Sequence, residues 1–214
     1  MLGERPLTPA RARAKLADLR RRGLNFDPAR CAGAGPGDGW RVDDHRQPLP
    51  GEPPGPPHPG GSWEVARDLM RRYQVADPAI VRALYDEREP LEGRTMLLEL
   101  RFWRLRFHVG VRVGAVYDER REVDGRPARV SGWSYRTLEG HLEMGEMAWE
   151  VWKWQDTGAV EFHIHACSRP APIDSALVRL GARLVARREQ LRFYRHACAR
   201  MASLVRAGVR GERP

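Results

Sequence analysis

The feature that most constrains this chain is a hydrophobic period of two in its middle. From Phe107 to Tyr117 apolar residues alternate with polar or small ones, which is typical of a β-strand with one buried face. Turn signals such as Asp124-Gly125 and Glu139-Gly140 separate further strand-like runs. Connections this short predict antiparallel neighbours in one sheet. The other strand-like runs are residues 96–105, 128–138, 146–154 and 160–168.

One long amphipathic helix is predicted after this sheet, from Asp174 to about Ala207. A sheet with one apolar face needs a cover on that side, and this helix can provide it. We therefore predict an α+β helix-grip fold, in which a curved antiparallel sheet of about six or seven strands wraps around the C-terminal helix. The apolar stripe of the helix comprises Leu177, Leu180, Leu184, Leu191, Tyr194, Cys198, Met201 and Val205.

The N-terminal part of the chain predicts shorter elements. A basic helix over residues 8–22, capped by Thr8 and Pro9, is followed by a strand over 40–45 and by helices over 63–73 and 80–85. Glycine or proline marks 31–39 and 48–61 as loops. We expect an N-terminal basic helix and Gly-rich loop over 1–37, the helix-grip domain over 38–207 and a disordered tail over 208–214.

Positive charge is concentrated at the two ends of the chain. The net charge is +9, from 37 basic and 28 acidic residues, and only Lys15 and Lys153 are lysines. This arginine excess is also typical of GC-rich coding, and no helix-turn-helix, zinc-finger or RNA-recognition signature is present. Nucleic acid is therefore not an expected partner, and binding through the Arg-rich ends stands last among our functional hypotheses.

The remaining composition limits the class of protein. No run approaches the ~18 apolar residues of a membrane span, and the N-terminus lacks the apolar core of a secretion signal. We expect a cytoplasmic protein that needs no cofactor. Cys31, Cys167 and Cys198 are odd in number and widely spaced, which favours free thiols over a disulfide framework or a zinc site.

A motif in the predicted sheet resembles a known family, the domain of unknown function nineteen ninety of plants and bacteria. Arg136 stands where that family usually has glycine, and Met147 where a second glutamate is common. The resemblance implies a START-like or birch-pollen-allergen-like helix-grip fold, whose members bind apolar or amphipathic small molecules. The motif is Gly132-Trp133-Ser134-Tyr135-Arg136-Thr137-Leu138-Glu139-Gly140-His141-Leu142-Glu143-Met144-Gly145-Glu146, and further matches are Val160 to Ala166, Ser168-Arg169-Pro170-Ala171, Leu180-Gly181, Gln190, Phe193, Arg195 and His196.

The densest polar cluster follows the predicted strand over 128–138. His141 with Glu143 or Glu146 could act as a general acid and base, because a neighbouring carboxylate raises the pKa of an imidazole and orients its ring. The alternatives are a structural hairpin and recognition of a polar ligand group. The candidate ligand-binding residues are Tyr135, Arg136, Thr137, His141, Arg169, Arg187 and Gln190.

Two other patterns leave alternatives open. Glu161, His163 and His165 share one strand face, a spacing compatible with a metal, although that face is expected to be the outer one. Arg187 interrupts the apolar stripe of the long helix. It either points towards the sheet, where a carboxylate or an anionic ligand must offset its desolvation, or it reaches the rim.

The tryptophans of one strand predict that both sheet faces are covered. Trp149 and Val151 share one face and Trp152 and Trp154 the other, so one of these two pairs needs a cover outside the core. The N-terminal helix or a homodimer through the outer face could provide it.

Three functions follow from these patterns. The first is binding of a small apolar or amphipathic molecule between the sheet and the last helix. The second is a cyclase- or hydrolase-type enzyme that uses the His/Glu pair in the same cavity; the residues alone do not decide whether the chain is an enzyme. The third is association with nucleic acid.

Overall fold

The computed structural model describes residues 7–33, 39–102, 105–172 and 176–212, with the side chains of 32, 102, 105 and 176–186 excepted. Within this part of the chain, seven strands form one antiparallel sheet in the order β1-β7-β6-β5-β4-β3-β2. The strands are β1 (Arg41–Leu49), β2 (Val81–Leu84), β3 (Thr95–Phe102), β4 (Leu105–Val123), β5 (Arg126–Thr137), β6 (Glu143–Trp154) and β7 (Val160–Pro170).

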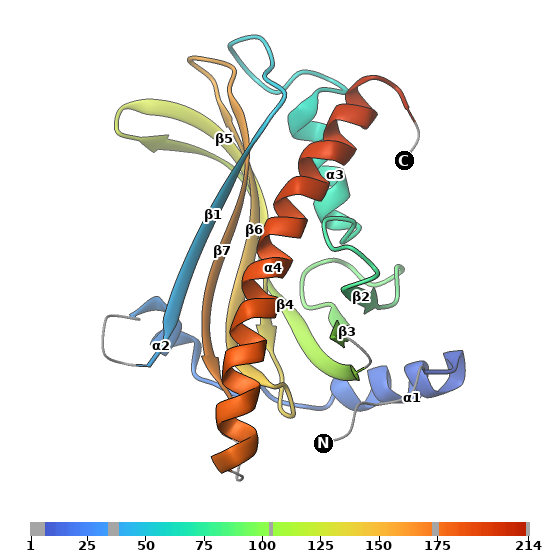
Figure 1. Ribbon diagram of the computed structural model, residues 1–214. Coiled ribbons are helices and arrows are strands. Elements are labelled where there is room, and N and C mark those ends of the chain that lie inside the picture. Colours follow the sequence, from blue (N-terminus) through green and yellow to red (C-terminus); the bar gives the residue numbers. More distant parts are fainter. Residues whose placement is uncertain (1–6, 34–38, 103–104, 173–175, 213–214) are drawn as a thin grey trace.

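Helix α4 (Ala176–Val209) runs along the curved sheet, with α3 (Ser62–Arg71) beside it (Figure 1). The predicted helix-grip fold is therefore confirmed. The helix extends two residues past its expected end. Of its predicted stripe, Leu177, Leu180 and Leu184 lie outside the described side chains, whereas Tyr194, Cys198, Met201 and Val205 are all buried.

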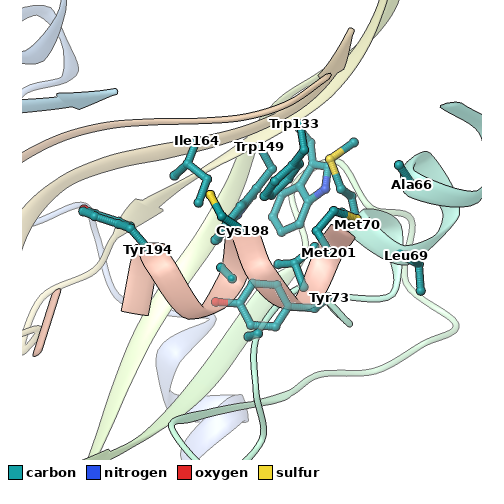
Figure 2. Close-up of a cluster of buried hydrophobic side chains, with 14 of the residues drawn as sticks. Ala66, Leu69, Met70, Tyr73, Trp133, Trp149, Ile164, Tyr194, Cys198 and Met201 are labelled. Carbon is teal, nitrogen blue, oxygen red and sulfur yellow. The ribbon is translucent and has the colours of Figure 1, made fainter. Parts of the chain in front are cut away.

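The principal core lies between the inner face of the sheet and the two helices α3 and α4 (Figure 2). Aromatic rings dominate its centre, since Trp149 is fully buried and stacks on Phe162 with ring centroids 6.0 Å apart. The rings of Trp133 and Tyr73 also pack together, with their centroids 6.1 Å apart. This packing fixes α3 and α4 against the same face of the sheet.

The turn between β4 and β5 follows its sequence signal. Asp124 and Gly125 are its two central residues, and both have positive φ, 52° and 72°. A two-residue loop with this backbone matches the twist of the strands that it joins, so the Asp-Gly signal is confirmed.

The predicted alternation along β4 breaks at a register shift between Val113 and Val116. Val111 and Val113 lie in the core, but Val116 follows them there and Tyr117 turns to the outer face. The expectation that Ala115 and Tyr117 continue the inner face is therefore wrong. An extra residue in one strand exchanges the faces of every residue beyond it.

The expected helix over 80–85 is the second correction, because residues 81–84 form the strand β2 instead. Asp77 begins the turn that precedes β2, and its backbone carbonyl accepts hydrogen bonds from the N–H groups of Ile80 and Val81 at 2.8 Å. Beyond it, Val81 pairs with Leu100 of β3. Pairing at a sheet edge overrides the short helical pattern here.

The cysteines are the third correction. Cys31, in α2 (Pro28–Ala32), forms a disulfide with Cys167 of β7, and only Cys198 is free. The two cysteines are 136 residues apart in the sequence. The short cysteine spacings that indicate a disulfide framework or a zinc site give no signal for such a distant pair. The bond attaches the N-terminal segment to the sheet.

The outer face of the sheet carries two small clusters. Helix α1 (Pro9–Leu19), whose cap Thr8 accepts a bond from the Arg11 N–H, packs its Leu16 and Leu19 on Leu97 and Leu138. The second cluster contains Trp152, which is 9% exposed. The N-terminal helix therefore does not cover Trp152 as expected. The residues that cover this tryptophan are Tyr117, Trp154, Arg121 and His163.

A buried ion pair fixes the loop between β1 and α3. Lys153 is fully buried, and its Nζ lies 3.1 Å from Glu52 Oε2 and donates to the Pro53 carbonyl at 2.8 Å. The other carboxylate oxygen of Glu52 accepts from the backbone N–H of Trp63 at 2.8 Å. One carboxylate thus joins the loop, the first turn of α3 and the sheet.

Candidate functional site

A cavity of about 140 Å³ lies between the sheet and α4. Apolar side chains from several elements line most of it, among them Ile80, Leu98, Met147 and Phe193. Ala166 of β7, which is 1% exposed, forms part of its wall. The polar lining residues come from β5, β6, β7, α4 and two loops: Tyr73, Tyr135, Thr137, His141, Glu143, Glu146, Ser168, Glu189, Gln190 and Tyr194.

A hydrogen-bonded network adjoins the cavity and joins β1 to α4. Both Arg187 guanidinium nitrogens contact the two oxygens of the buried Asp43 carboxylate at 2.6 Å. Arg187 also donates to Gln190 Oε1 at 2.8 Å, and the amide of Gln190 donates to Ser168 Oγ at 3.0 Å and to Glu143 Oε2 at 3.3 Å. Arg187 therefore faces the sheet, and a carboxylate of the chain neutralises it.

His141 lies in the turn between β5 and β6. Gly140, with φ of 85°, forms the bend, and His141 Nδ1 lies 2.9 Å from the Glu143 backbone nitrogen and 3.0 Å from the Glu143 carbonyl oxygen. Burial lowers the pKa of His141 to about 4, so the ring is neutral at pH 7. The backbone occupies Nδ1, which leaves Nε2 as the nitrogen available for other contacts.

Glu143 has the side chain best suited to proton transfer in the cavity. Burial raises the pKa of its carboxyl group above the usual value, whereas the nearby positive charges of Arg41 and Arg187 act to lower it. Its Oε2 atom accepts a hydrogen bond from the neutral amide of Gln190. A carboxyl group in this setting can hold or accept a proton near neutral pH.

The Glu146 carboxylate and the Arg136 guanidinium lie on the other face of the sheet, although the Glu146 residue forms part of the cavity wall. Their neighbours Tyr135 and Met147 belong to the core side of the sheet, so the side chains at 136 and 146 point to the outer face. There Glu146 Oε2 accepts from Arg136 Nε at 3.0 Å, and Glu146 Oε1 accepts from Ser134 at 2.5 Å. The carboxylate that shares the cavity with His141 is therefore that of Glu143.

With this geometry established, comparison with known proteins places the chain in a family. Residues 27–200 match the family described as Domain of unknown function (DUF1990). The chain belongs to this family. No curated protein sequence matches it.

Several solved structures are similar to the DUF1990 chain at low sequence identity. A ginseng major latex-like protein from Panax ginseng is 12% identical, with a TM-score of 0.41, and the match covers 71% of this chain and 95% of that one. Human STARD10 is 10% identical, with a TM-score of 0.34 and coverages of 92% and 82%. The protein Ara h 8.0201 is 10% identical, with a TM-score of 0.40 and coverages of 77% and 99%.

The remaining predicted ligand residues of this DUF1990 chain differ in their positions. Tyr135 and Thr137 line the cavity, and the Thr137 hydroxyl accepts a bond from the Gly145 N–H at 2.9 Å and lies 2.6 Å from Asn25 Oδ1. Arg169 is exposed, at the end of β7 near Gly39, and is not among the residues that line the cavity. The structure thus brings together Tyr135, Thr137, His141, Glu143 and Gln190, with Arg187 adjoining them.

The predicted metal pattern lies on the outer face. His163 Nε2 contacts Glu161 Oε2 at 2.8 Å and the His163 ring stacks on Trp152, while His165 Nδ1 contacts Asp44 at 2.7 Å. Among the described residues, no group of three or more His, Cys, Asp or Glu side chains could hold a metal ion.

No helix in the described ranges is long and apolar enough to cross a membrane.

An open groove of about 670 Å³ lies between α1, the segment around β2 and α4. Arginines from four parts of the chain line it, Arg13, Arg72, Arg82 and Arg200, so part of the basic charge of both chain ends faces one surface. Arg200 is already bonded to the Gln74 carbonyl at 2.9 Å. If the chain binds nucleic acid, this groove is the surface where the basic residues gather. None of the predicted catalytic or ligand-binding residues lines it.

Sequence reasoning missed Tyr73, which lines the cavity from the end of α3. Its φ of 56° is left-handed, and the N–H groups of Tyr73 and Gln74 donate to the carbonyls of Met70 and Leu69 at 2.9 Å. These bonds form a Schellman cap, in which glycine usually occupies the left-handed position. A non-glycine residue there costs about 1–2 kcal/mol. The helical pattern of 63–73 marks where α3 ends but does not indicate this backbone.

Asp43 was also missed as a functional candidate. The available signal was indirect, because an inward-facing Arg187 requires a carboxylate, and residues 41–49 form the strand that meets α4. Identifying that carboxylate needed the order of strands, which puts β1 beside β7 at the sheet edge.

Proposed function

We propose that the chain binds a small apolar or amphipathic molecule in the cavity between the sheet and α4. The observation that carries the proposal is the cavity itself, an apolar space of about 140 Å³ with a few polar groups on its wall. This combination is typical of small-molecule sites, where apolar contact supplies affinity and the polar groups set orientation. Tyr135, Thr137, His141 and Gln190 are the proposed orienting residues, and Arg187 holds Gln190 in place.

Native mass spectrometry of the purified protein tests whether a small molecule is retained, and it also gives the number of subunits. The expected result is a mass above that of the chain which disappears on denaturation. The Ala166→Leu variant fills the cavity from β7 and should abolish the added mass. The matched control is Ala148→Leu, because Ala148 belongs to the neighbouring strand and lies on the outer face. Equal retention by the two variants would contradict the proposal.

A second candidate function is acid–base catalysis in the same cavity. The specific observation that favours it is the buried Glu143 carboxyl group with its raised pKa, next to the neutral ring of His141. In this reaction Glu143 would transfer the proton, and His141 would donate a hydrogen bond from Nε2 to the substrate. A cyclase or hydrolase of this type should lose its turnover in Glu143→Gln while still binding the substrate, and it should retain turnover in Glu146→Gln.

A further inference from the structure

Two tyrosine hydroxyls in the wall of the cavity are not hydrogen-bonded. Tyr73 is 6% exposed and Tyr194 is fully buried, and neither hydroxyl has a hydrogen-bond partner among the described residues. Figure 2 shows both side chains in the cluster around α4. A buried hydroxyl without a partner is unfavourable, so such a group in a native wall calls for an explanation. The indole N–H groups of Trp133 and Trp149 also lack partners, but these residues do not line the cavity.

A third hydroxyl in the wall is weakly bonded. The Tyr135 hydroxyl donates to the thioether sulfur of Met147 at 3.3 Å, and another polar neighbour is the Tyr73 hydroxyl, which lies close enough for each to shift the pKa of the other. A thioether is a poor acceptor compared with an oxygen. Burial raises the pKa of Tyr73, Tyr135 and Tyr194 above the usual value, so all three hydroxyls stay protonated and can donate. The cavity therefore offers donors that the chain itself leaves without a good acceptor.

The charge of the lining limits what could accept these bonds. The acidic residues that line the cavity are Glu143, Glu146 and Glu189, of which Glu146 has its carboxylate paired with Arg136 on the outer face, and no described lysine or arginine lines the cavity. Arg187, in the adjoining network, is already paired with Asp43. A bound anion would thus lose its hydration without gaining a positive partner, and it would lie near Glu143. An acceptor oxygen without charge has neither disadvantage.

The size of the cavity limits the ligand further. An apolar cavity of roughly 150 Å³ in another protein holds one benzene molecule, and the cavity here measures about 140 Å³. A molecule built on a single six-membered ring has the matching size.

From these observations we infer that the cavity selects uncharged molecules about the size of one aromatic ring that carry a carbonyl or similar acceptor oxygen. The hydroxyls of Tyr73 and Tyr194 are the proposed donors to that oxygen, either one or both according to the ligand. This inference rests on the proposed binding function and specifies its ligand class.

Four probes of nearly equal size test the inference by titration calorimetry or ligand-observed NMR. Acetophenone is uncharged with an acceptor, ethylbenzene is uncharged without one, benzoate is an anion and benzylamine is a cation. Acetophenone should bind roughly three- to tenfold more tightly than ethylbenzene, the range expected for one net hydrogen bond. Benzoate and benzylamine should bind more weakly than acetophenone.

The variants Tyr73→Phe and Tyr194→Phe remove one hydroxyl each and keep the ring. At least one of them should abolish the preference for acetophenone over ethylbenzene. Both should unfold at the same temperature as the parent protein or at a higher one, because each removes a buried hydroxyl that has no protein partner. Tyr117→Phe is the control, since Tyr117 lies on the outer face and bonds Glu150; it should keep the preference.

The possible failures are distinguishable. If none of the four probes binds, the proposed function fails together with the inference. If ethylbenzene binds as tightly as acetophenone, or if benzoate or benzylamine binds most tightly, only the ligand class is wrong. If both Phe variants unfold at clearly lower temperatures, the hydroxyls stabilise the fold and the inference is overturned.

Discussion

Asp43 of β1 and Arg187 of α4 form a two-bonded ion pair, with both nitrogen–oxygen distances 2.6 Å, that joins an edge strand to the central helix. The Asp43 side chain is 9% exposed and the Arg187 side chain 31%. Arg187 in turn holds Gln190 against Ser168 and the Glu143 carboxylate. The pair therefore couples the position of α4 to the polar end of the cavity.

Replacing Asp43 with asparagine should destabilise the protein by about 1–3 kcal/mol, because the partly buried guanidinium loses its charged partner. Urea unfolding measures this change. Asp44→Asn is the control, since Asp44 is exposed and its contact with His165 lies at the surface; we expect a change within about 0.5 kcal/mol there. Equal effects of the two substitutions would contradict a structural role for the inward pair.

The low pKa of His141 predicts a specific acid sensitivity. The pKa of the ring is about 4 in the folded chain and about 6.5 in the unfolded chain. The unfolded state therefore binds more protons between these values, and the stability that His141 contributes is complete above pH 6.5 and is lost as the pH falls to 4. The contribution is at most about 3 kcal/mol.

His141→Asn keeps an acceptor for the Glu143 N–H but does not titrate. Glu143, whose pKa is raised, changes stability in the opposite direction as the pH rises, so the informative quantity is the difference between parent and variant. We expect the difference in unfolding free energy to change between pH 6.5 and pH 4 and to be constant above pH 7. A pH-independent difference over the whole range would show that the ring is not desolvated.

The disulfide between Cys31 and Cys167 predicts a thiol count. The denatured protein should react with one equivalent of a thiol reagent without reductant, at Cys198, and with three after reduction. Cys31→Ser should lower the unfolding free energy by about 2–4 kcal/mol, because the bond closes a long loop in the unfolded chain. Three reactive thiols before reduction would refute the pairing.

Gly145 predicts a steric limit at the cavity wall. A Cβ atom added at Gly145 would lie 2.1 Å from the Cys167 carbonyl oxygen, and φ at this residue is 155°. Gly145→Ala should destabilise the protein by about 2–3 kcal/mol, since backbone must move. Gly125→Ala is the comparison, because φ there is also positive but no atom lies within 4 Å, and about 1 kcal/mol is expected. Thermal unfolding of both variants measures the difference.

The sequence predicts the fold well where one signal dominates. The Asp124-Gly125 turn, the period of two and the long final helix each have a local cause, and together they lead to the observed sheet and its cover. The prediction of residues 80–85 was wrong because a short apolar run fits both a helix and a strand. Pairing of Val81 with Leu100 decides between them, and that pairing is a long-range property.

The candidate site was predictable only in part. The β5–β6 turn and α4 bring five of the candidate residues to one cavity, as predicted: Tyr135, Thr137, His141, Glu143 and Gln190. The face of each side chain decides the rest, and it separates Glu146 from His141 although they are near in sequence. Asp43 and Tyr73 depend on strand order and on a left-handed backbone, which one sequence does not reveal.

The register shift in β4 has a consequence for how this chain can change. Before it, substitutions at positions such as Val111 and Val113 alter the interior that faces α4, whereas Tyr117 beyond it contributes to the separate patch around Trp152. One strand thus contains two independent sets of positions. Substitutions in the first set can change the shape of the interior without altering the outer face of the sheet. Substitutions in the second set can change the outer face without altering the interior.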